Sequence, residues 1–230
     1  GPGGAGGTPP MSRKPIVGVV YSRSTEASDQ SLLQARYVAC ALANTGYALV
    51  HLVPFGEGDG AAVPESGSLR FQPPGGGRRV CVGPGLVREV PWAEAMPASL
   101  DLVVLCNNPN DSEAVGTALK AALPQDWDKP VFCLQRGVRN GAAVKGALST
   151  HGVTVLDGVA GFWAVEVDSD QTVEAFPRGA GLAIERLSRD SFAIADGPSR
   201  LLEHMGHPIV YHKVLTQYSW GVLQLEASHA

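Results

Sequence analysis

The fold is decided by residues 15–53, which read PIVGVVYSRSTEASDQSLLQARYVACALANTGYALVHLV. Residues 15–21 are a short β-branched run of the kind that forms a buried strand. From Ser31 to Thr45 apolar residues recur at helical spacing, and Gly46 stands where a helix C-cap belongs. Residues 47–53 are a second apolar run. Because parallel neighbouring strands need a crossover helix, this β-α-β opening predicts a doubly wound α/β sheet.

The same alternation of strands and helices continues along the chain. Two short runs separated by Pro-Pro-Gly-Gly-Gly, at 68–72 and 78–82, predict a hairpin. The other predicted strands cover 101–106, 129–134 and 153–159, and the predicted helices cover 111–123, with Asp111 or Ser112 as N-cap, and 140–149.

Shorter runs without helices between them follow the last predicted helix. They lie at 161–167, 172–176 and 181–184, and they predict an antiparallel extension of the sheet. From Arg200 to the end the pattern is helical instead. The residues that fall on one face of this predicted C-terminal helix are Val210, Val214, Leu215, Tyr218 and Val222.

The length of the chain fits one domain with appendages. At 230 residues it can bury one sizeable hydrophobic core but not two. Residues 1–14 are rich in Gly and Pro and predict a tail, because neither residue favours a helix or a central strand. We therefore expect a Rossmann-like domain over 15–199 and a helical segment over 200–230.

Charge and composition argue against two classes of partner. The chain has 18 Lys and Arg against 22 Asp and Glu, a net charge of −4, and no basic run. Nucleic-acid binding needs clustered Lys and Arg to neutralise phosphates. No stretch approaches the roughly 20 apolar residues of a membrane helix. We expect a soluble chain with no nucleic-acid partner and no direct membrane span.

The cysteines and histidines give little sign of a metal site. Cys40, Cys81, Cys106 and Cys133 lie far apart inside apolar runs, with no C-x2-C pair. We interpret all four as buried, reduced thiols of a reducing compartment. His204, His207 and His212 lie close in sequence, but Gly206 and Pro208 interrupt the helix that would align them. We therefore expect no metal.

The loop after the first predicted strand lacks the signal for a dinucleotide. A Rossmann domain normally carries G-x-G-x-x-G there, because glycines let the backbone approach the pyrophosphate at the helix N-terminus. Here residues 22–31 hold no glycine, and Glu26 and Asp29 place negative charge at the helix start. The second strand ends without an acid for a ribose hydroxyl. The one central G-x-G, Gly83-Pro-Gly85, predicts a turn.

Four segments, in order and spacing, resemble the N-terminal domain of ketopantoate reductases (2-dehydropantoate 2-reductases). They are DLVVLCNNPNDSEA at 101–114, VFCLQRGVRN at 131–140, VLDGVAGF at 155–162 and YHKVL at 211–215. The hairpin and the ANTGY helix end at 43–47 also fit. The resemblance implies a Rossmann domain whose relatives bind NADPH and reduce a 2-keto acid.

The positions that the resemblance assigns to ligands are altered. The family's glycine-rich loop falls near 30–35, where this chain has QSLLQA. A Lys that contacts the cofactor is replaced by Asn108, and the Asn of the family's Leu-Gln-Asn-Gly motif is replaced by Arg136. Lys213 matches the catalytic Lys, which acts as general acid. The resemblance also implies that the family's helical second domain is missing, since the chain stops at Ala230.

Our leading hypothesis is therefore a degenerate, non-catalytic domain that binds no cofactor and serves as an accessory subunit of a larger protein assembly. We expect Tyr218, Trp220 and Leu223 to dock on another subunit. A mitochondrial respiratory complex or ATP synthase is the expected assembly. The alternative is an NADPH-dependent 2-keto acid reductase with an atypical cofactor loop and Lys213 as acid. A third hypothesis is a regulatory module that senses a small anion through Arg136.

Overall fold

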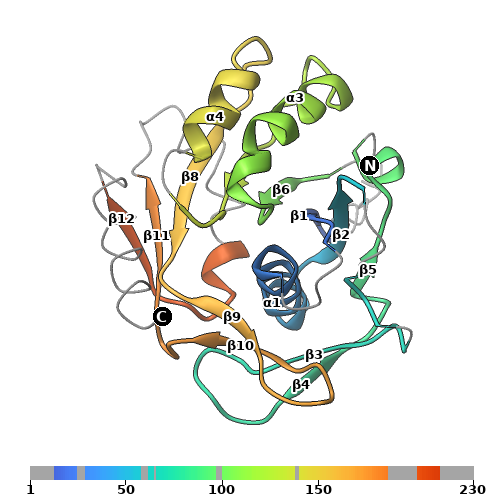
Figure 1. Cartoon of the computed structure of the whole chain (residues 1–230), viewed down its shortest axis with the longest axis vertical. Coiled ribbons are helices and arrows are strands. Elements are labelled where there is room, and N and C mark those ends of the chain that lie inside the picture. Colours follow the sequence, from blue (N-terminus) through green and yellow to red (C-terminus); the bar gives the residue numbers. More distant parts are fainter. Residues whose placement is uncertain are drawn as a thin grey trace, which may run out of the picture.

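Two β-sheets enclose a central helix in the computed structural model of the chain (Figure 1). The structure describes residues 13–24, 29–57, 62–64, 66–96, 100–137, 140–185 and 201–212.

The larger sheet has eight strands in the order β12-β11-β8-β7-β6-β1-β2-β5. All neighbouring strands run parallel except β11 and β8, which are antiparallel. This confirms the predicted doubly wound, mostly parallel sheet. Its strands are β1 (Ile16–Ser22), β2 (Leu49–Phe55), β5 (Val87–Glu89), β6 (Leu102–Leu105), β7 (Val131–Cys133), β8 (Val155–Ala160), β11 (Leu182–Glu185) and β12 (Ile209–His212).

The smaller sheet is built from two strand pairs that are distant in sequence. Its order is β4-β3-β10-β9, with β3 parallel to β10 and the other neighbours antiparallel. The hairpin predicted from the Pro-Pro-Gly-Gly-Gly turn is therefore confirmed. The bounds are β3 (Leu69–Phe71), β4 (Val80–Val82), β9 (Trp163–Glu166) and β10 (Val173–Phe176).

Helix α1 (Gln30–Asn44) lies between the two sheets and is buried nearly all round. It contacts β1 and β2 of the larger sheet and β3, β4, β9 and β10 of the smaller one. Tyr37, at its centre, packs its ring against Phe71 and Phe162. The helix is therefore the core element that joins the sheets.

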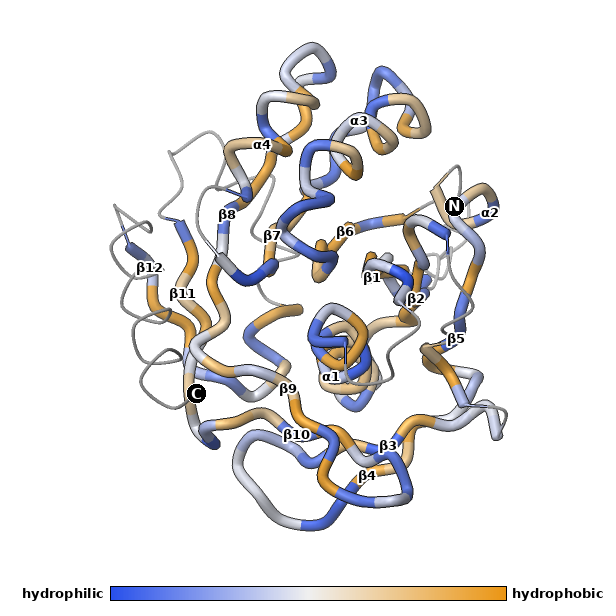
Figure 2. Tube along the Cα trace, viewed as in Figure 1, coloured by the Kyte–Doolittle hydropathy of each residue, from blue (hydrophilic) through white to orange (hydrophobic). Residues whose placement is uncertain are grey.

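The opposite face of the larger sheet is covered by the helices that follow β5, β6 and β7 (Figure 1). The β-strand alternation divides the core between the two faces: Val17 and Val19 pack on the α1 side, whereas Val20 packs on the other. Figure 2 shows β6 as hydrophobic along its length. The covering elements are α2 (Trp92–Ala95), the 3-10 turn η1 (Pro109–Asp111), α3 (Ser112–Ala122) and α4 (Asn140–Ala147).

Several details differ from the expectations drawn from sequence. The predicted C-terminal helix is wrong at residues 209–212, which form the parallel edge strand β12 beside β11. The predicted antiparallel extension is split, because β9 and β10 join the smaller sheet while β11 joins the larger one. Strand β5 and helix α2 were not predicted. Cys81 is exposed, whereas the other three cysteines are buried as expected.

No helix within the described ranges combines the length and the hydropathy that crossing a bilayer requires.

Candidate functional site

The carboxyl ends of β1 and β6 form the topological switch point of the larger sheet. After β1 the chain builds β2 and β5 on one side, then returns to β6 on the other side of β1. In open α/β sheets the ligand crevice lies at such a reversal. The residues that follow β1, β6 and β7 and the start of α1 therefore define the candidate site.

The N-terminus of α1 is capped by a carboxylate of this chain. Asp29 Oδ1 accepts hydrogen bonds from the backbone N–H of Ser31 at 2.7 Å and of Leu32 at 3.4 Å. The Asp29 carbonyl accepts from the N–H of Leu33. In dinucleotide-binding folds these first N–H groups and the positive end of the helix dipole face the pyrophosphate. Here they already bond to a negative group.

A serine bridges the ends of β1 and β6. Ser22 Oγ donates to Asp111 Oδ2 at 2.5 Å and accepts from the backbone N–H of Asn108 at 2.9 Å. The backbone N–H of Ser22 donates to Ser31 Oγ at 2.8 Å. Asp111 occupies the N-cap position of α3, but its side chain makes no cap hydrogen bond. The predicted N-cap position is therefore confirmed at Asp111, but its carboxylate bonds to Ser22 instead of to the helix N–H groups.

Buried amides fill the space between α1, β6 and β7. Gln34 Nε2 donates to the Leu134 carbonyl at 2.6 Å, so its side chain spans from α1 to the end of β7. Gln135 Nε2 donates to Asn107 Oδ1 at 3.1 Å. All three amide side chains are buried. Gln34 stands in the segment that the sequence resemblance matches to a glycine-rich loop, and a bulky side chain there hinders the close approach of a ligand.

The guanidinium groups near this edge already have partners. Arg136 donates to Gln30 Oε1 at 3.2 Å, across from β7 to the start of α1. Arg36 donates from Nε to the Ala62 carbonyl at 2.6 Å, and its head group lies 3.6 Å from Glu166. Burial lowers the pKa of Arg36, with the Glu166 carboxylate opposing that effect. These side chains bind protein groups, as structural arginines do.

The described residues of the crevice therefore do not fit a dinucleotide bound in the Rossmann manner. The helix N-terminus carries the Asp29 carboxylate, and no glycine stands at 22–35 to admit a phosphate. The Ser22 bridge joins the ends of β1 and β6, and the Gln34 side chain joins α1 to the end of β7. A pyrophosphate placed here would displace these bonds and face a like charge.

The histidines of the C-terminal part do not form a ligand cluster in the ranges that the structure covers, where no group of His, Cys, Asp or Glu gathers at metal-binding distance. Both ring nitrogens of His207 are bonded. Nδ1 donates to the Ala180 carbonyl at 2.7 Å, so Nε2 accepts from the Tyr37 hydroxyl at 2.8 Å. His204 stacks on Tyr47. His207 is thus a packed core residue.

The structure brings together some of the residues singled out from the sequence. Asn108 lies in the crevice, but through its backbone, and Arg136 lies beside the start of α1. Lys213, Tyr218, Trp220 and Leu223 lie outside the described residues, so their roles stay predictions.

Sequence reasoning missed the buried crevice residues Gln34, Asn107 and Gln135. A usable signal was present for two of them, because Asn107 and Gln135 directly follow buried strands that end at one edge of a parallel sheet. Gln34 gave no such signal, since a lone Gln inside a helical pattern is usually exposed.

No protein-family model matches the sequence, and no curated protein matches it. Solved structures do match it. A ketopantoate reductase from Ralstonia eutropha shares 19% identity at a TM-score of 0.59, covering 89% of this chain and 59% of that one. A 2-dehydropantoate 2-reductase from Geobacter metallireducens shares 15% identity at a TM-score of 0.61, covering 89% and 60%.

A D-mandelate dehydrogenase, solved with NADH and anilino(oxo)acetate, shares 17% identity at a TM-score of 0.58, covering 87% of this chain and 58% of that chain. The chain thus spans about 60% of the length of the solved structures that it matches. Identities this low establish a shared architecture. The chain has the Rossmann-type fold of the ketopantoate reductases, over the part of their length that it covers.

Proposed function

We propose that this chain is a non-catalytic domain of ketopantoate-reductase fold that acts through contacts with other protein subunits rather than through a nicotinamide cofactor. The observation that carries the proposal is the Asp29 carboxylate on the N-terminal N–H groups of α1. A fold can keep its architecture after its site has changed, because function resides in the site. A mitochondrial respiratory or ATP synthase complex as the assembly stays a prediction.

The polar bonds of the crevice support this proposal further. The Ser22 bridge to Asp111 and Asn108, and the Gln34 bond to Leu134, satisfy groups that would otherwise need a ligand or water. Breaking buried hydrogen bonds costs about 1–3 kcal/mol for each group left unpaired. A dinucleotide would have to offset that cost before gaining any affinity.

Apolar side chains on the surface supply contacts that a protein partner could cover. Val210 and Tyr211 have exposed side chains on β12, the outermost strand of the larger sheet among the described residues. Phe176 lies exposed on β10, where its ring packs against Trp163. Exposed apolar side chains of this kind are surface that a protein partner can bury. These residues complement the predicted contacts at Tyr218, Trp220 and Leu223.

The test is a calorimetric titration of the folded chain with NADPH and with NADP⁺ at low salt. We expect no binding up to about 1 mM nucleotide, which corresponds to a binding free energy weaker than about 4 kcal/mol. A ketopantoate reductase titrated in parallel is the positive control. Micromolar binding by the wild-type chain would overturn the proposal.

A matched variant tests whether the charge of Asp29 or the side chains that cross the crevice exclude the nucleotide. Asp29→Asn removes the negative charge while its side-chain oxygen can still accept the cap hydrogen bonds. If weak nucleotide binding appears in this variant, repulsion by the carboxylate is the main barrier. If binding stays absent, the side chains that cross the crevice, Gln34 and Ser22, exclude the ligand by themselves.

A second candidate function, an NADPH-dependent 2-keto acid reductase, is favoured by the solved structures that share the fold. These include ketopantoate reductases and a D-mandelate dehydrogenase solved with NADH. In this case the nucleotide binds in a manner other than the usual Rossmann one, and Lys213 supplies the proton to the ketone. NADPH oxidation in the presence of ketopantoate, lost in Lys213→Met, would support it.

A further inference from the structure

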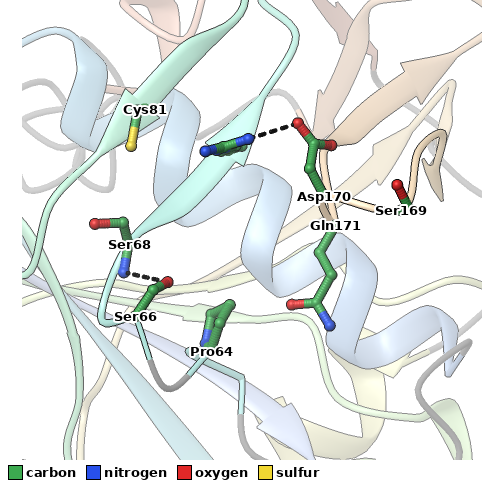
Figure 3. A pocket seen from close by; sticks show the side chains of 8 residues that line it. Pro64, Ser66, Ser68, Cys81, Ser169, Asp170 and Gln171 are labelled. Carbon is green, nitrogen blue, oxygen red and sulfur yellow. Dashed lines mark hydrogen bonds and ion pairs between the residues drawn. The ribbon is translucent and has the colours of Figure 1, made fainter.

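A hollow of about 370 Å³ lies on the smaller sheet, away from the switch-point crevice (Figure 3). Its walls come from the segment before β3, from the β3–β4 hairpin and from the turn between β9 and β10. The volume falls in the usual range for small-molecule sites. Its lining residues are Pro64, Ser66, Ser68, Arg70, Cys81, Ser169, Asp170 and Gln171.

The hollow lies on the outer face of this sheet. Leu69, Phe71 and Val82 point inward and pack in the core with α1. Arg70 and Cys81 alternate with them and are exposed, and they are directly opposite each other in the antiparallel β3–β4 register. The thiol and the guanidinium therefore stand side by side in the hollow.

Cys81 is the one accessible thiol among the four of the chain. Cys40, Cys106 and Cys133 are buried, and burial raises the pKa of each of these thiols. A thiolate is the reactive form of cysteine, and a neighbouring cation stabilises it. Exposure and the adjacent Arg70 thus distinguish Cys81 from the three structural cysteines.

The charge of Arg70 is shared with a carboxylate. Arg70 donates to Asp170 Oδ2 at 2.7 Å, and Asp170 in turn accepts from the backbone N–H and the hydroxyl of Thr172. The hydrogen bond from the Thr172 hydroxyl, followed by that from Arg70, lowers the pKa of Asp170 to about 2, so it is ionised at neutral pH. Asp170 therefore partly neutralises the cation that faces Cys81, and removing its charge strengthens the field at the thiol.

The rest of the hollow suits a small polar peptide. Ser66, Ser68 and Ser169 contribute hydroxyl groups and Gln171 contributes an amide, as Figure 3 shows. These groups can donate to carboxylates and to peptide carbonyls. Together with Arg70 they match the glutathione class of tripeptides, which carry carboxylates, an ammonium group and peptide carbonyls around a central sulfur.

We propose that this hollow is a thiol-modification site in which Cys81 exchanges with low-molecular-weight disulfides of the glutathione class. The Cys81 thiolate attacks one sulfur of the disulfide, the S–S bond of the reagent breaks, and a mixed disulfide forms on the protein. The leaving thiolate takes a proton from water. The reagent disulfide is the oxidant, so no other electron acceptor is needed.

The test uses the full chain incubated with glutathione disulfide, followed by intact-mass analysis and peptide mapping. We expect one glutathione per chain, on Cys81, and none in Cys81→Ser. Arg70→Gln should slow the exchange about fivefold, and Asp170→Asn should accelerate it, because the two changes weaken and strengthen the positive charge at the thiol. Arg79→Gln, in the same hairpin but outside the hollow, should leave the rate unchanged.

Cystamine is the comparison reagent, because it is a small disulfide that carries ammonium groups and no carboxylates. The wild-type chain should react faster with glutathione disulfide than with cystamine. In Arg70→Gln this difference in rate should disappear. Equal rates for wild type, Arg70→Gln and Asp170→Asn would overturn the proposal and leave Cys81 as an ordinary surface thiol. The result is independent of nucleotide binding in the crevice.

Discussion

His207→Leu is expected to lower the free energy of unfolding at pH 7 by about 3 kcal/mol, since it leaves the buried Tyr37 hydroxyl and the partly buried Ala180 carbonyl without this hydrogen-bond partner. His207 lies just before β12 in the chain and bonds to the Ala180 carbonyl and the Tyr37 hydroxyl, which belong to distant parts of the chain. Its ring also stacks on Phe162, with centroids 4.3 Å apart. The leucine can replace the packing but neither hydrogen bond. Urea unfolding followed by fluorescence measures the change.

The same residue makes stability depend on pH. Burial lowers the pKa of His207 below its ordinary value of 6.5, although the bond to the Ala180 carbonyl opposes this effect. The unfolded chain therefore takes up a proton before the folded chain does. The contribution of His207 is fully present above pH 6.5 and is lost as the pH falls toward the lower folded-state pKa.

Unfolding curves at pH 7 and pH 5 check this sign. The wild-type chain should lose stability between these values, and His207→Leu should lose less. Some dependence should persist, because burial and Arg88 also lower the pKa of His51. His204→Gln, at an exposed histidine in the same segment, is the matched control for replacing a histidine there. An unchanged slope in His207→Leu would contradict the assignment.

The elements that the sequence predicts well are those with a strong local signal. The first strand is a β-branched run, α1 has helical spacing, and Gly46 ends it with a φ of 73°. The three residues of strand β5 show no local hydrophobic pattern that predicts a strand. They form one because they pair with β2. The helix predicted at residues 209–212 is wrong for a similar reason. Their apolar positions fit a helix in sequence, but pairing with β11 makes them a strand.

The site is only partly predictable. The missing glycines and the negative charge of Asp29 are visible in the sequence. Both make the N-terminus of α1 unfavourable for a bound phosphate. The bonds that close the crevice are not visible, because Ser22 and Asp111 are separated by 89 residues. The burial of α1 on all sides likewise depends on β3, β4, β9 and β10 folding over it, which no local pattern reveals.

The second large effect is expected at Gly158 in β8, where the chain passes close to a buried ring. A Cβ added there would lie 2.8 Å from Phe132 Cζ and 3.2 Å from the Cys133 carbonyl oxygen. Phe132 belongs to β7, which pairs with β6 and β8, and its side chain is fully buried in the core on the α1 side, so it cannot move away without displacing other core residues. Inserted carbons in a packed core therefore strain both the ring and the backbone of β7.

Gly158→Ala should lower the free energy of unfolding by about 2 kcal/mol and Gly158→Val by about 4 kcal/mol, which corresponds to a fall in Tm of about 8–16 °C for valine. The control is Gly146→Ala in α4, where no atom lies within 4 Å of the added Cβ. That change should stabilise the chain by about 0.5–1 kcal/mol, because alanine favours a helix over glycine. Calorimetric melting of the three variants compares the same kind of substitution in a filled and an open space. Equal effects at both positions would mean that β7 and β8 do not pack as closely as the structure places them.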